Sequence, residues 1–116
     1  KIIVGTRGWQ DDENAQDKKI LKRENIRLEL SIKDGIKKYG EGKEIIVCMH
    51  YPPFNRYEEN SLNLISTMKK YNVSTCIYGH LHGETAHKTV KEGKIQEINY
   101  KMVSCDYTNF ELIQIC

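Results

Sequence analysis

Apolar residues follow a regular pattern over the first two thirds of the chain. Three short apolar runs, at residues 2–4, 44–49 and 74–78, predict strands, and the second is continuous, as expected of a strand covered on both faces. Between the runs, apolar residues recur at helical spacing and predict two helices. These positions are Leu21, Leu28, Ile32 and Ile36, then Leu62, Leu64, Ile65, Met68 and Tyr71. The alternation of strands and helices is typical of an α/β unit with parallel strands.

The ends of these helices are marked by charge and by helix-stopping residues. Asp11, Asp12 and Glu13 place negative charge before the first helix, and Gly40 is expected to end it. Asn72 is expected to end the second helix. The charged residues of the first helix are expected to form a solvated surface; they are Lys18, Lys19, Lys22, Arg23, Glu24, Arg27 and Glu29.

The last third of the chain has a different pattern. Residues 85–91 and 94–99 flank Glu92-Gly93, a turn sequence, and predict an antiparallel hairpin. Two more short strands are expected around residues 102–105 and 110–115. His87 then lies in the middle of a strand, where a structural or exposed role is expected.

Composition and charge narrow the functional class. The chain has 116 residues, with 18 Lys and Arg against 16 Asp and Glu, which gives a net charge of +2. This length predicts one domain, and the slight basic excess forms no stripe with interleaved aromatics, as a nucleic-acid-binding surface would need. An apolar run of about 18 residues, as a membrane span requires, does not occur. The four cysteines are widely spaced, which favours reduced thiols and a cytoplasmic location.

Three of the four histidines directly follow predicted strands. His50 follows the second strand and precedes Pro52-Pro53, which must end that strand. His80 and His82 follow the third strand in the segment Gly-His-Leu-His-Gly. If this segment stays extended, alternation places both imidazoles on one side and Leu81 toward the core. Ligands of such sheets collect beyond the carboxyl ends of the strands, and neutral imidazole is a common metal ligand, so we expect a metal site there.

The two motifs, His-x-Pro-Pro and Gly-His-x-His-Gly, resemble the last two metal-binding motifs of the calcineurin-like metallophosphoesterase superfamily. The bacterial phosphohydrolases of the superfamily are the most similar, because residues 5–9, Gly-Thr-Arg-Gly-Trp, resemble a loop that they carry upstream of the long helix. The order and spacing of the motifs carry the resemblance, which extends over essentially the whole chain.

The resemblance implies a phosphoester hydrolase with two divalent transition-metal ions, which could be manganese, iron, zinc, nickel or cobalt. His50 and His80 would bind one ion and His82 the other, and the ions would activate a water or hydroxide that attacks phosphorus. The implied fold is a four-layer αββα sandwich. This chain would supply one sheet, its helical layer and a C-terminal antiparallel stretch.

Three further motifs of the family have no counterpart in these 116 residues. They are Asp-x-His, Gly-Asp-x-x-Asp and Gly-Asn-His, which supply the bridging aspartate and the histidine that assists the leaving group. We therefore expect residues 1–116 to be a single partial domain, the C-terminal half of the enzyme, which is inactive alone and needs the N-terminal half as its partner. The start at a lysine rather than a methionine fits this expectation.

Three other points remain open at this stage. Arg7, on the glycine-rich loop, can bind a substrate phosphate through its guanidinium or can form a salt bridge. The chain can also be a binding or regulatory module with a structural zinc site, formed by Cys48, His50, Cys76 and His80, although their spacings depart from the usual zinc motifs. Trp9, Tyr51 and Phe54 can line a substrate pocket or pack on the domain.

Overall fold

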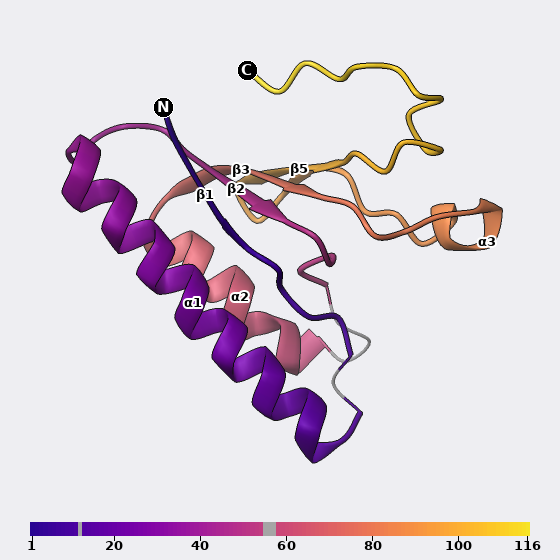
Figure 1. Cartoon of the computed structure of the whole chain (residues 1–116), viewed down its shortest axis with the longest axis horizontal. Coiled ribbons are helices and arrows are strands. Elements are labelled where there is room, and N and C mark those ends of the chain that lie inside the picture. The colour runs from indigo at the N-terminus through magenta and orange to yellow at the C-terminus, as the bar shows by residue number, and fades with distance from the viewer. Residues whose placement is uncertain (12, 55–57) are drawn as a thin grey trace.

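The computed structural model describes residues 1–11, 13–54 and 58–116 and shows an α/β fold built on one mixed sheet (Figure 1). Within those residues, five strands lie in the order β1-β2-β3-β5-β4. Strands β1, β2, β3 and β5 are parallel, and β4 pairs antiparallel with β5 at the edge. Their bounds are Ile2–Thr6 for β1, Ile45–Met49 for β2, Val73–Tyr78 for β3, Gly93–Ile95 for β4 and Ile98–Met102 for β5. The three strands predicted from apolar runs are thus confirmed.

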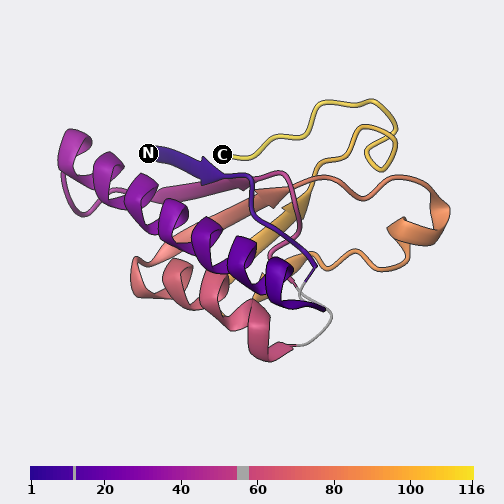
Figure 2. The same cartoon turned by 60° about the horizontal axis from the view of Figure 1, so that its bottom comes forward.

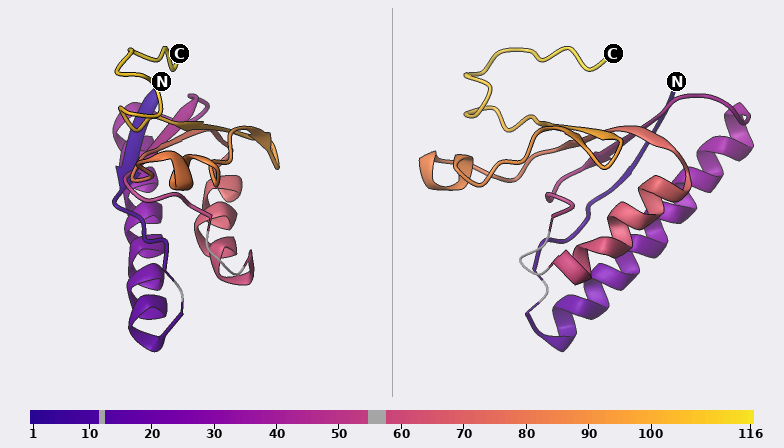
Figure 3. Two further views of the ribbon diagram at one scale, coloured as in Figure 1. Left: turned by 90° about the vertical axis from the view of Figure 1, so that its right-hand side faces the viewer. Right: turned by 180° about the vertical axis from the view of Figure 1, so that it is seen from behind.

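Two long helices cover one face of the sheet (Figures 2 and 3). Helix α1 (Ala15–Tyr39) connects β1 to β2, and α2 (Glu58–Lys70) connects β2 to β3. Because the chain moves in one direction across these strands, right-handed crossovers bring both helices to the same face. A short helix, α3 (Glu84–His87), lies beyond the carboxyl end of β3 (Figure 1). In the described part of the chain, none of the helices has the length and apolar character required to cross a membrane.

Helix α1 is capped at both termini, and its C-terminal end is at Gly40, as the sequence predicts. The side chain of Asn14 accepts a hydrogen bond of 2.9 Å from the backbone N–H of Asp17 and caps the first turn. At the other end, Gly40 has a φ of 91° and donates its N–H to the carbonyl of Ile36. Asp12, one of the acidic residues expected before the helix, lies outside the described residues.

The core lies between the sheet and the two helices. The predicted apolar positions Leu21, Leu28 and Ile32 of α1 are buried, and Ile36 packs at the edge of the core. From α2, Leu64, Ile65 and Met68 are buried, whereas the side chain of Leu62 lies outside the described ones. The strands contribute Ile2, Val4, Ile45, Val47, Met49, Val73, Cys76, Tyr78, Ile98, Tyr100 and Met102.

One residue of the predicted solvated face is in fact buried. Glu24 is buried, because the end of β1 and the residue after it supply partners for its carboxylate, Thr6 and Arg7. Thr6 donates a hydrogen bond of 2.6 Å and Arg27 one of 2.7 Å. Burial alone would raise the pKa of Glu24, but these hydrogen bonds outweigh it and hold the pKa below its ordinary value.

The predicted C-terminal strands are wrong in most of their positions. The segment around His87 forms α3 rather than a strand, and Gly93 begins β4 instead of forming a turn. The hairpin turn is at Gln96 and Glu97, which have φ values of 47° and 72°, as a two-residue turn with left-handed backbone requires. Residues 103–116 contain turns but no strand, so the strands expected around residues 102–105 and 110–115 are absent, apart from Met102 at the end of β5.

The second face of the sheet has no helix over it among the described residues, and the C-terminal segment runs along that side (Figures 1 and 3). The amino group of Lys101 donates a hydrogen bond of 2.9 Å to the carbonyl of Gln114 and ties the segment to β5. Ile3 is 69% exposed, and Phe110 and Leu112 of the C-terminal segment are also largely exposed. Ile46 of β2, which alternation places on the same face as Ile3, is buried, so apolar surface on this side is accessible at Ile3 but not along the whole sheet.

The two long helices are joined by Glu29 of α1. Its carboxylate accepts hydrogen bonds of 2.9 Å from Lys70 and 2.7 Å from Tyr71, and these lower its pKa from 4.5 to about 2. The stabilisation is therefore present above pH 4.5 and lost as the pH falls through about 2. We expect Glu29→Gln to lower the melting temperature at neutral pH and the difference to shrink below pH 4.5. Exposed Glu41→Gln is the control, and a difference independent of pH would contradict this prediction.

Candidate metal centre at the carboxyl edge of the sheet

Polar residues follow three neighbouring parallel strands at the same edge of the sheet. His50 comes directly after β2, and His80 and His82 follow β3. Cys105 and Asp106 follow β5, which lies beside β3. Because the strands are parallel, their carboxyl ends meet at one edge, so residues far apart in the sequence come together there.

His50 and His80 approach each other closely. Nε2 of His50 lies 3.1 Å from Nδ1 of His80, and the ring planes make an angle of 71°. The backbone N–H of Gly79 also donates to the carbonyl of His50, which links the two loops. Two imidazole nitrogens bound to one ion at about 2.0–2.1 Å, with a bond angle of about 90–110°, would lie about 2.9–3.4 Å apart. The 3.1 Å separation is compatible with one shared transition-metal ion and is also that of a hydrogen bond between the two rings when one of these nitrogens carries a proton.

The backbone at His80 is bent rather than extended. His80 has a φ of 71°, in the left-handed region, and the N–H of Leu81 donates to the carbonyl of Gly79. The extended segment expected from the sequence is therefore wrong, although Leu81 does pack against the core as predicted. Desolvation, together with the neighbouring His50 and His82, lowers the pKa of His80. The lower pKa favours the neutral imidazole that metal binding requires.

The loop after β1 lies beside this histidine pair. The backbone N–H groups of His50 and Tyr51 both donate to the carbonyl of Arg7, at 3.2 and 3.0 Å. The ring of Tyr51 stands 4.4 Å from the ring of His80 and 5.1 Å from that of Trp9, measured between centroids. Tyr51 thus borders the histidine pair, whereas Trp9 contacts Tyr51 and packs against the core. Phe54 instead packs on Tyr78 and Tyr100 of the core.

The side chain of Arg7 is engaged in contacts within the fold. Its Nη2 lies 3.3 Å from Oε1 of the buried Glu24, and its guanidinium lies over the ring of Trp9. This arrangement is the salt bridge that the sequence left open as the alternative to phosphate binding.

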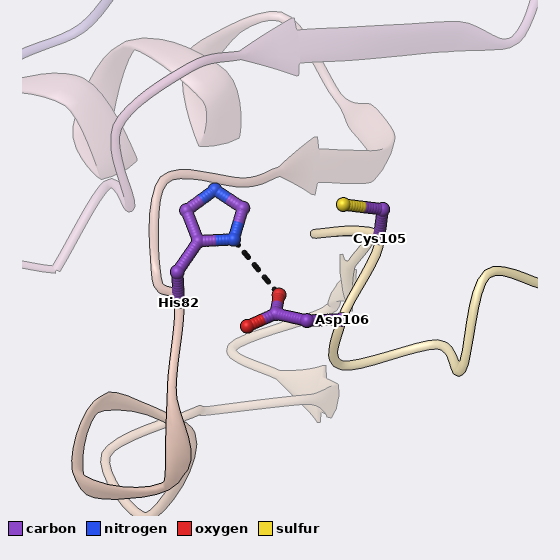
Figure 4. A group of neighbouring side chains, drawn as sticks. All are labelled: His82, Cys105 and Asp106. Atoms are coloured by element: carbon purple, nitrogen blue, oxygen red, sulfur yellow. Dashed lines mark hydrogen bonds and ion pairs between the residues drawn. The ribbon is translucent and has the colours of Figure 1, made fainter.

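His82 belongs to a second group of side chains, shown in Figure 4. Its Nδ1 lies 2.8 Å from Oδ1 of Asp106, and the other oxygen of Asp106 accepts the backbone N–H of Gly83 at 2.8 Å. Chiefly the hydrogen bond from Gly83 lowers the pKa of Asp106 to about 2. In the described part of the chain, His82, Cys105 and Asp106 are the only three ligand-type side chains whose candidate metal-binding atoms all lie within 4.8 Å of one another.

The four residues of the alternative zinc site do not converge. Cys76 is fully buried in the core under the helices, whereas Cys48, between the buried Val47 and Met49, is exposed. Because neighbouring residues of a strand point to opposite faces, Cys48 points to the face of the sheet away from the helices. Burial raises the pKa of the Cys76 thiol, which disfavours the thiolate that binds zinc.

Sequence reasoning identified the histidines but missed Asp106 and Cys105. These two residues are 24 and 23 positions beyond His82, in a segment that we predicted to contain strands. The available signal is the alternation of apolar and polar residues over Ile98–Met102, which is typical of a strand, because Cys105 and Asp106 follow this segment after two further residues. Comparisons of the chain with protein-family models, with curated proteins and with solved structures found no match.

Proposed function

We propose that this chain is part of a metal-dependent phosphoester hydrolase with a binuclear centre. His50 and His80 would hold one divalent cation, and His82 would hold the other. The observation that carries the proposal is the 3.1 Å approach of Nε2 of His50 to Nδ1 of His80, at the edge where parallel strands end. The resemblance of the two histidine motifs to those of metallophosphoesterases supports the same assignment.

Two bound cations would supply a nucleophilic hydroxide and neutralise negative charge on the phosphoryl oxygens. The chain's own residues would provide the metal ligands and keep them in position. Desolvation lowers the pKa of His80, which favours its neutral form, and the hydrogen bond from the N–H of Gly79 to the carbonyl of His50 links the two loops that carry the imidazoles. Tyr51, which contacts Trp9, forms an aromatic border where the organic part of a phosphoester can pack.

The proposed enzyme needs further ligands from outside these 116 residues. Three imidazoles carry no negative charge, and two cations held close together require an anionic bridge between them. We propose that an N-terminal half of the same domain supplies this bridge and completes an αββα sandwich. On the face of the sheet away from the helices, Ile3 of β1 is 69% exposed, and this apolar surface supports the packing of a second sheet against that edge. The four unpaired thiols favour a cytoplasmic location.

An activity assay on two proteins tests the proposal. The complete gene product that contains this chain is expected to hydrolyse an artificial aryl phosphodiester with Mn²⁺, Zn²⁺ or Ni²⁺, and a chelator is expected to stop the reaction. The isolated 116-residue chain is expected to bind these ions weakly and to show no turnover. Robust turnover by the isolated chain that vanishes in His82→Ala would refute the need for a second half. A complete protein without metal-dependent turnover would refute the proposed function.

A further inference from the structure

Asp106 makes contacts with three groups of the segment that follows β3. Oδ1 lies 2.8 Å from Nδ1 of His82, and Oδ2 accepts the backbone N–H of Gly83 at 2.8 Å. Oδ2 also lies 3.3 Å from Nε2 of His87, whose ring nitrogen is buried and has no hydrogen bond. Both oxygens of the carboxylate are thus engaged by the protein.

The loop that carries Asp106 is itself held by hydrogen bonds. The backbone N–H groups of Tyr107 and Thr108 donate to the carbonyl of Ser104, at 3.0 and 3.1 Å. The N–H of Phe110 and the hydroxyl of Thr108 both donate to the carbonyl of Cys105. These hydrogen bonds form a compact turn directly after β5, and this turn holds Asp106 in position beside His82.

A carboxylate only accepts hydrogen bonds, so its contact with His82 requires the proton to be on Nδ1. The neutral ring then has its lone pair on Nε2. In metal sites a carboxylate commonly holds a histidine in this way and so orients the nitrogen that binds the ion. From this contact we propose that Asp106 is a positioning residue, which holds His82 in the Nδ1–H tautomer and so makes Nε2 the metal-binding atom. This inference rests on the proposed function, because it assigns a role within the same metal centre.

A direct ligand role for Asp106 is the competing arrangement. Nδ1 of His82, the thiol of Cys105 and a carboxylate oxygen of Asp106 could then surround one ion, with no proton on Nδ1. Both oxygens of Asp106 already have protein partners, which favours the positioning role. To bind an ion directly, Oδ1 would have to lose its hydrogen bond with Nδ1 of His82 and accept the cation in its place. The two arrangements differ in which ring nitrogen of His82 carries the proton.

The first test determines, without any metal, which ring nitrogen of His82 carries the proton. Two-bond ¹H–¹⁵N spectra of the ¹⁵N-labelled chain, at a pH where His82 is neutral, are expected to show the Nδ1–H tautomer. In Asp106→Ala, His82 is expected to be a mixture of the Nδ1–H and Nε2–H tautomers. In Asp106→Asn, the side-chain carbonyl oxygen can still accept the hydrogen bond from Nδ1, so the Nδ1–H tautomer is expected to be restored. Asp34→Ala, at an exposed position of α1, is the matched control. An Nε2–H tautomer in the parent chain, or no change in Asp106→Ala, would overturn the proposal.

The second test adds Co²⁺ and follows its binding to His82. Asp106→Ala is expected to weaken this binding by about 10–100-fold, and Asp106→Asn is expected to weaken it less. A thiolate-to-cobalt absorption band that disappears in Cys105→Ser would show direct ligation and overturn the positioning role. A tautomer that depends on Asp106 supports the positioning role even if no cation binds, and the absence of binding would then count against the proposed function alone.

Discussion

His80→Ala in the complete gene product is expected to lower the proposed metal-dependent phosphodiester turnover by more than about 100-fold. Loss of a residue that merely orients a ligand costs about 10–100-fold in metal affinity or activity, and His80 is proposed as a ligand itself. Its Nδ1 lies 3.1 Å from Nε2 of His50, so removing the ring would leave His50 as the single histidine ligand of the proposed ion. Initial rates with an artificial aryl phosphodiester, together with the metal content of the purified protein, measure the effect.

Two cysteine variants serve as controls for this prediction and separate it from the structural zinc alternative. Cys48→Ser and Cys76→Ser are expected to keep the bound metal and most of the activity, because the two thiols lie away from the histidine pair. Loss of stoichiometric zinc in both variants would favour the alternative site. Full activity of His80→Ala would contradict the assignment of His80 as a ligand.

Gly5→Ala is expected to destabilise the chain by at least about 3 kcal/mol, at the upper end of the cost of overpacking. A β-carbon at this position would overlap the carbonyl oxygen of Cys48 on the neighbouring strand. The obstacle is backbone rather than the end of a flexible side chain, so β1 and β2 would have to separate. The total stability of a domain is about 5–15 kcal/mol, so this loss removes a large fraction of it.

Urea unfolding followed by circular dichroism measures this loss of stability. Ile3→Val is the matched control, because Ile3 lies two residues away on the same strand and is 69% exposed. Its unfolding free energy is expected to change by less than about 0.5 kcal/mol. Equal stability of Gly5→Ala and Ile3→Val would show that the two strands can move apart at no cost.

The first two thirds of the fold could be predicted because local pattern and tertiary structure agree there. The apolar spacing of Leu21, Leu28 and Ile32 corresponds to the buried side of α1, and Gly40 ends the helix as its conformational freedom allows. Glu24 could not be placed correctly, since its burial depends on Thr6 and Arg7, which reach it from another element. Local charge alone predicts exposure for such a residue.

The prediction for the last third is wrong because it rests on the turn preference of individual residues, which is a weaker effect than the pairing of strands in the folded sheet. Glu92-Gly93 has the composition of a turn, yet Gly93 starts a strand and the turn is formed by Gln96 and Glu97, residues with no special preference for it. The tyrosine Tyr78 helps to fix this arrangement, since its hydroxyl donates to the carbonyl of Lys91 at 2.6 Å. Such a contact between distant residues leaves no periodic signal.

The candidate site was predictable only in part, for the same reason. His50, His80 and His82 could be found because each follows an apolar run, and a parallel sheet brings the ends of such runs together. Asp106 follows an alternating strand segment, Ile98–Met102, but its contact with His82 depends on β5 being the neighbour of β3. Strand order of this kind is set by the whole sheet and cannot be read from either segment.

The left-handed backbone at His80 has an evolutionary consequence. At a φ of 71°, a side chain costs conformational energy that glycine avoids, and asparagine tolerates this region better than most residues. Thermodynamic stability and metal binding therefore make opposite demands on position 80. Selection for a more stable protein would favour glycine there, whereas selection for the proposed metal binding would retain histidine, so the identity of this residue in related chains would test that proposal.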